Sequence, residues 1–187
     1  MKKQVQRQQT QEKIIAGFLQ LLAHEDFKLI TVDQICREAQ VGRSTFYKYY
    51  QDKWQLMTAI LEVELQWFTT ELATRFANRN LLSETNLTAI VKTLLDRGPR
   101  LQQLWDYAFE GASLRDRFAT MIQQKVQPLI ETQLDLGISS AYLALLYSDV
   151  ATSMLSWQLF HGFDRAAIDF SIKLLRETLV TKKHSDD

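Results

Sequence analysis

The sequence predicts an all-α protein in two parts, an N-terminal three-helix domain with a helix-turn-helix and a C-terminal helical bundle. Glycine (6) and proline (2) are scarce among the 187 residues, and 46% of the residues are hydrophobic, which together favour a globular helical chain. Apolar residues also recur at helical spacing between short polar or glycine-containing breaks. We therefore expect residues 1–51 to form the first domain and residues 52–187 the second.

The first domain is predicted to contain three helices. Residues 1–9 are polar and basic, and we expect them to be loose. The apolar spacing predicts one helix from Thr10 to about residue 24. A second begins after Thr31, with Gln34 at the capping-box position, and stops before Gly42, which tolerates the dihedrals of a turn or a helix cap. A third, about two turns long, begins at residue 43. The expected core is Ile15, Phe18, Leu19, Leu22, Val32, Ile35, Ala39, Phe46 and Tyr50.

The second domain is expected to open with a long helix, capped by Asp52 and ending before residues 78–80. Further helices are predicted over residues 83–96, 100–109, 112–136, 139–161 and 164–179, with Ser83 and Asp164 as caps. Pro128 removes one backbone hydrogen bond, so we expect a kink there. The polar tail, residues 182–187, is expected to be disordered.

The outward face of the third helix is basic, hydroxyl-bearing and aromatic, which suits contacts with a DNA major groove. Arg43 is the candidate for reading a base edge, most naturally guanine, and Ser44 and Thr45 suit bases or phosphates. For Tyr47 and Tyr49 the alternative is partial burial against the long helix. The candidates for phosphate contact are Thr31, Tyr47, Lys48, Tyr49 and Lys53.

Residues 31–56 resemble the DNA-binding signature of TetR/AcrR-type transcriptional regulators. Four positions depart from it: Cys36 stands where Ala is common, Gln40 where Gly is, Gly42 where Ser or Thr is, and Trp54 where an acid is. The matching positions are Thr31, Ile35, Ala39, Val41, Ser44, Phe46, Tyr47, Tyr49, Lys53 and Leu56.

The resemblance implies a regulator that binds a palindromic double-stranded DNA operator as a homodimer. Such regulators are more commonly repressors than activators, and a small-molecule effector releases them from DNA. The C-terminal bundle would then serve for effector binding and dimerisation. The rival interpretation is a co-regulator of the same fold that acts through a protein partner without binding DNA. The first 55 residues contain nine Lys and Arg and six Asp and Glu, and this small positive charge is compatible with both interpretations.

The last two predicted helices carry much apolar surface, which predicts pairing with a second copy; the alternative is an intrachain core. Aromatic residues also accumulate in the second domain, where the resemblance implies an effector pocket. Each of these residues has an alternative role in the core. The candidates for the pocket are Trp105, Tyr107, Tyr147 and Trp157, with Glu110 or Asp149 as polar partners.

Other classes are disfavoured. One cysteine forms no intrachain disulfide, and His24, Cys36, His161 and His184 are too far apart in the sequence to predict a metal site. The chain shows no catalytic constellation, so we expect neither an enzyme nor a cofactor. It has no run of about 20 apolar residues and no signal-peptide pattern, so we expect no membrane contact and a cytoplasmic location.

Overall fold

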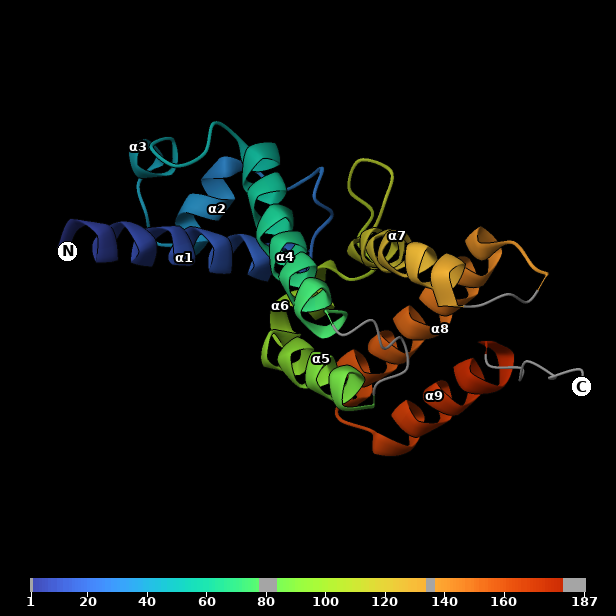
Figure 1. Cartoon of the computed structure of the whole chain (residues 1–187). Coiled ribbons are helices and arrows are strands. Elements are labelled where there is room, and N and C mark those ends of the chain that lie inside the picture. Colours follow the sequence, from blue (N-terminus) through green and yellow to red (C-terminus); the bar gives the residue numbers. More distant parts are fainter. Residues whose placement is uncertain (1, 78–83, 134–136, 180–187) are drawn as a thin grey trace, which may run out of the picture. The chain divides into compact units, whose positions relative to one another are not determined.

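The computed structural model describes residues 2–77, 84–133 and 137–179, and these ranges form helices joined by short connections (Figure 1). The chain divides into two compact units, Met1–Glu64 and Leu65–Asp187. The division lies within α4 (Lys53–Arg75), whereas the boundary expected after residue 51 lies just before that helix begins. The expected break at residues 78–80, the cap at Ser83, the helix end at residue 136 and the polar tail fall outside the described residues.

The first unit contains α1 (Lys2–Leu22), α2 (Val32–Glu38), α3 (Arg43–Phe46) and the first half of α4. The prediction of a loose arm over residues 1–9 is wrong, because α1 already begins at Lys2. Glycine and proline are absent from this segment, so nothing interrupts the helix. Thr10 is not its cap, since its hydroxyl donates to the Gln6 carbonyl within the helix at 2.8 Å.

The core of the first unit is close to the predicted one, with a shift of one residue in α1. Ile14 is fully buried and Ile15 only half-buried, because Ile14 shares a helical face with the buried Phe18. Leu22 and Val32, also predicted in the core, are half-buried. The backbone of α1 approaches the C-terminal end of α2 closely at Gly17, where an added Cβ would lie 2.8 Å from the nitrogen of Ala39, the C-cap of α2.

The helix-turn-helix is held by local capping and by one residue in the left-handed region. Thr31 and Gln34 form the predicted capping box at the start of α2. Gly42 is the N-cap of α3, with an extended backbone at a φ of −74°, and Gln40 takes the positive φ of 53° in the turn before it. α3 is shorter than the two turns expected, and turns continue its path through residue 49.

The second unit contains the rest of α4 with α5 (Glu84–Asp96), α6 (Gly98–Leu104), α7 (Leu114–Gln133), α8 (Ser140–His161) and α9 (Arg165–Leu179). α6 starts earlier than the 100–109 helix expected, because Pro99 fits the first turn of a helix, and it also ends earlier, at Leu104. A tight turn follows, with Glu110 and Gly111 both at positive φ. Asp164 caps α9 as predicted, accepting from the Ala167 N–H at 3.1 Å.

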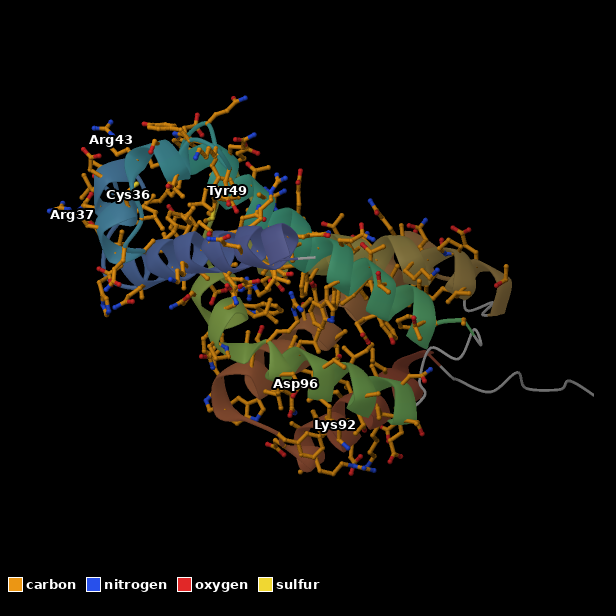
Figure 2. All side chains as sticks on the ribbon, turned by 90° about the vertical axis from the view of Figure 1, so that its left-hand side faces the viewer. Cys36, Arg37, Arg43, Tyr49, Lys92 and Asp96 are labelled. Carbon is orange, nitrogen blue, oxygen red and sulfur yellow. The ribbon has the colours of Figure 1, made fainter. Side chains whose placement is uncertain are left out.

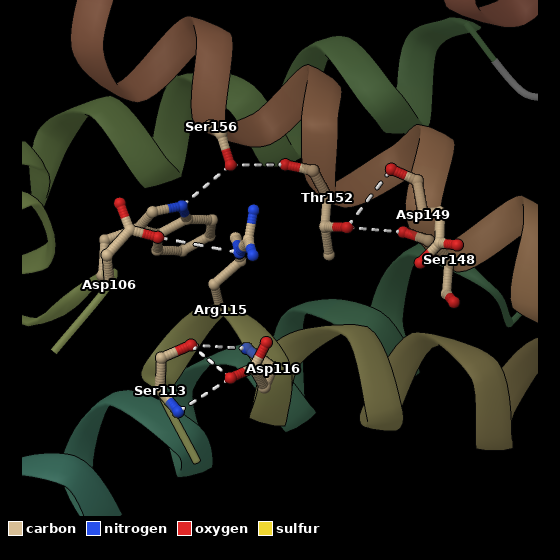
Figure 3. Close-up of polar contacts among 9 residues, drawn as sticks. Asp106, Ser113, Arg115, Asp116, Ser148, Asp149, Thr152 and Ser156 are labelled. Carbon is tan, nitrogen blue, oxygen red and sulfur yellow. Dashed lines mark hydrogen bonds and ion pairs between the residues drawn. The ribbon is translucent and has the colours of Figure 1, made fainter. Parts of the chain in front are cut away.

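Polar side chains join elements within the second unit (Figure 3). The Trp105 indole N–H donates to the Ser156 hydroxyl at 2.8 Å, and that hydroxyl donates to the Thr152 carbonyl at 2.8 Å. At the start of α7, the Asp116 carboxylate accepts from both the N–H and the hydroxyl of Ser113. The hydroxyl in turn accepts from the Asp116 N–H, so a capping box begins α7.

Candidate nucleic-acid interface

Arg43 begins α3 and lies on the outer surface of the helix-turn-helix. Its Nη1 donates to Asp33 Oδ2 at 3.3 Å, and its Nε lies 3.1 Å from Asp33 Oδ1. The Tyr47 hydroxyl and the Asp33 carboxylate both stabilise the guanidinium, which raises the pKa of Arg43 above its ordinary value. The candidate base-reading residue is therefore charged and held by two neighbours.

The other candidates on and after α3 differ in exposure. Ser44, Tyr47 and Lys48 are exposed, with Tyr47 at 49%, whereas Thr45 and Tyr49 are half-buried. The Tyr49 ring lies beneath Arg7 of α1, whose guanidinium carbon is 5.8 Å from the ring centroid. Tyr49 is thus the more covered of the two tyrosines, with only part of its surface open to a phosphate.

Lys53 and Thr31 already have partners within the protein. The Lys53 ammonium donates to the carbonyls of Phe27, Lys28 and Ile30 at 2.7, 2.9 and 2.6 Å, which uses its three N–H donors. It holds the α1–α2 connection against the start of α4. The Thr31 hydroxyl donates to the Gln34 side chain at 2.7 Å. A phosphate at either residue would compete with these bonds.

Arg37 is a cationic candidate that the sequence reasoning missed. It lies four residues after Asp33 on α2, hence on the same face of that helix, and it is exposed. Figure 2 shows Arg37 and Arg43 at the same end of the first unit. The i, i+4 relation to Asp33 was visible in the sequence, but the pairing of Asp33 with a residue of the next helix was not.

In the part of the second unit that the structure describes, the aromatic candidates for an effector pocket differ in burial and do not all line the cavity found there. Trp105 is fully buried and hydrogen-bonded, Tyr107 is half-buried, and Trp157 is 47% exposed and stacks on His161 at 3.8 Å between ring centroids. Tyr147 alone among the four lines a small apolar cavity of about 20 Å³ in the second unit. The cavity is lined by Phe68, Leu72, Phe76, Leu87, Ile90, Ile122, Tyr147, Ala151, Met154 and Leu155.

The outer faces of α8 and α9 carry large apolar side chains exposed to solvent. Tyr142, Leu146, Trp157 and Phe160 recur at helical spacing along α8. Phe170 of α9 is 66% exposed, and Leu174 lies one turn further along. Exposed apolar side chains gathered in this way mark an interaction surface more often than solvated surface. Within the described residues, no helix is long and apolar enough to cross a membrane.

These features define a helical protein with an N-terminal helix-turn-helix and a separate C-terminal helical unit. Residues 14–60 match the family model of bacterial regulatory proteins, tetR family. No curated protein matches the chain. The chain therefore carries a TetR-family DNA-binding domain, within the two-part helical fold of TetR-family transcriptional regulators.

Solved structures of similar fold extend the match over nearly the whole chain. NalD of Pseudomonas aeruginosa, the secondary repressor of the MexAB-OprM multidrug efflux pump, has a TM-score of 0.69 at 17% identity, covering 94% of this chain and 99% of its own. A TetR transcriptional regulator from Streptococcus agalactiae has a TM-score of 0.65 at 22% identity, with coverages of 94% and 98%. Reduced NemR of E. coli has a TM-score of 0.59 at 14% identity, with coverages of 92% and 99%. At these identities the likeness concerns the fold alone.

Proposed function

We propose that this chain is a homodimeric transcriptional regulator that binds operator DNA through α2 and α3 and acts by binding, not by catalysis. The observation that carries the proposal is the exposed set of Arg37, Arg43 and Lys48 on a helix-turn-helix whose residues match the family model. Phosphate contacts by lysine and arginine supply affinity, and base contacts supply sequence preference.

In the proposed complex, Arg43 reads guanine, because a guanidinium donates to O6 and N7 at once. Ser44 lies beside it with an exposed hydroxyl, and Lys48 and Arg37 contact phosphates on either side. Tyr47 contributes its exposed phenol. Lys53 keeps the structural role that its three carbonyl partners give it.

Two copies are needed because α3 is only four residues long and one such helix makes few base contacts. We assign the dimer interface to the exposed apolar faces of α8 and α9, around Trp157 and Phe170. A two-fold pairing of these helices would bury both faces in a four-helix bundle. A two-fold dimer reads a palindromic operator.

The proposed mode is repression that an effector relieves. The site we assign to the effector is the apolar cavity that Tyr147 and Met154 line, and its walls suit an uncharged, apolar molecule. A cavity of about 20 Å³ is too small for a drug-sized molecule, so the effector must displace side chains when it binds. Met154 is suited to this because its thioether side chain is flexible.

Fluorescence anisotropy with a duplex selected from random-sequence DNA tests the proposal. Lys48→Ala should weaken binding to selected and random DNA equally and lower the salt slope by about one. Arg43→Ala should relax the preference at one position per half-site, at a cost of about 1–3 kcal/mol. Lys92→Ala removes an exposed lysine of the second unit and serves as the control. Wild-type protein that selects no duplex would contradict the proposal and favour the co-regulator that binds a protein partner.

A further inference from the structure

An acidic side chain lies beside the base-reading candidate on the face proposed to meet DNA. Asp33 of α2 contacts Arg43 of α3 through both carboxylate oxygens, at 3.1 and 3.3 Å. The two side chains are 55% and 62% exposed, so the pair lies at the surface. An ion pair this exposed adds little to folding stability. Asp33 also lies in the first turn of α2, where the helix dipole favours a negative charge, so folding stability gives a modest reason to place a carboxylate where it repels phosphates.

We propose that Asp33 is a positioning residue that orients the Arg43 guanidinium for reading one base, an inference that rests on the proposed binding of DNA by this helix-turn-helix. The contact joins the two helices of the motif across ten residues of sequence. It therefore ties the direction of the arginine to the position of α2 as well as to its own helix.

The physical basis is the geometry of the guanidinium. Reading guanine requires two N–H donors aligned with O6 and N7 in the plane of the base pair. A free arginine side chain must give up many rotamers to reach that alignment. Asp33 occupies part of the five-donor fork, and the remaining donors are held in a defined direction. Tyr47, which follows Arg43 by one turn, interacts with the same guanidinium.

Asp33 should then have two opposite effects on DNA binding. Its charge repels phosphates, which weakens binding to every sequence. Its contact with Arg43 raises the preference for the right base. Asp33→Asn should consequently tighten binding to random DNA while reducing the preference for guanine over adenine, by about three- to tenfold, at the position read by Arg43.

The experiment uses full-length protein and the duplex that the wild type selects from a random-sequence pool. The position read by Arg43 is the one at which Arg43→Lys loses preference. Dissociation constants are then measured for duplexes with guanine or adenine there. Glu38→Gln is the matched control, because it removes an exposed carboxylate from the same helix. It should tighten binding to random DNA similarly and leave the base preference unchanged.

Two further variants separate orientation from folding. Asp33→Glu keeps the carboxylate and should recover most of the preference that Asp33→Asn loses. Asp33→Asn in the Arg43→Lys background should cause no further loss, since the lysine has no planar fork to orient. The inference is overturned if Asp33→Asn behaves as Glu38→Gln does, with uniformly tighter binding and an unchanged ratio. Failure of the wild type to select any duplex overturns the proposed function itself.

Discussion

Replacing Gly17 by alanine tests the packing that holds the helix-turn-helix against α1. Gly17 is a buried helical position, and the Cβ of an alanine there would lie 2.8 Å from the nitrogen of Ala39 and 3.1 Å from its Cα. Both are backbone atoms of Ala39, the C-cap of α2, so no side-chain rotation relieves the contact. The two helices must move apart.

Two effects of opposite sign decide the magnitude. Alanine is favoured over glycine inside a helix by about 1 kcal/mol. Overpacking costs about 1–3 kcal/mol, and contact with backbone atoms places Gly17→Ala at the upper end. The expected net result is a loss of about 2 kcal/mol in the free energy of unfolding. For a domain the size of the first unit, this loss lowers the melting temperature by roughly 10 °C.

Differential scanning calorimetry of the full chain measures the effect. Ala16→Gly is the matched control, because Ala16 directly precedes Gly17 in α1 but is exposed. It should cost about 1 kcal/mol through helix propensity alone. If Gly17→Ala instead stabilised the protein by a similar amount, propensity would be the only effect, and the close approach of α1 to α2 would be refuted.

Three further predictions concern the dimer, the turn and the response to acid. Phe170→Glu should weaken the proposed dimer by about 4 kcal/mol, since a two-fold interface carries the change twice. Light scattering should then report the mass of one chain, 21.8 kDa. Leu29→Glu is the control, because Leu29 is equally exposed but lies in the first unit, and this variant should leave the dimer intact. Gln40→Gly should raise the free energy of unfolding, measured by urea titration, by about 1 kcal/mol, because glycine adopts a positive φ without strain. Gly42→Ala is the control: Gly42 has an extended φ, so the substitution should not raise the free energy of unfolding. Hydrogen bonds from the hydroxyl and N–H of Ser113 lower the pKa of Asp116 below its ordinary value. Its contribution to stability is therefore complete above the ordinary pKa of an aspartate and is lost as the pH falls through the lowered pKa. In thermal melts of Asp116→Asn this part of the acid dependence should disappear.

Short-range patterns in the sequence predicted much of the fold. Thr31 and Gln34 indicated the start of α2, and Asp164 indicated the start of α9, because each cap involves residues three positions apart. The positions of the helices along the chain followed from apolar spacing, which likewise involves only residues three or four positions apart. The one-residue error between Ile14 and Ile15 arose because both are apolar, and only the packing of α1 against the rest of the first unit selects one.

The candidate site was predictable as a set of residues but not as a geometry. The sequence alone determined a helical chain with an N-terminal helix-turn-helix and Arg43 at the start of its second helix, since these depend on neighbours within a few residues. Only the tertiary structure decided that Asp33 contacts Arg43, that Lys53 is used by three carbonyls, and that Gln40 takes the left-handed turn position. Such contacts depend on how separate helices meet in space, which no local pattern of residue types encodes.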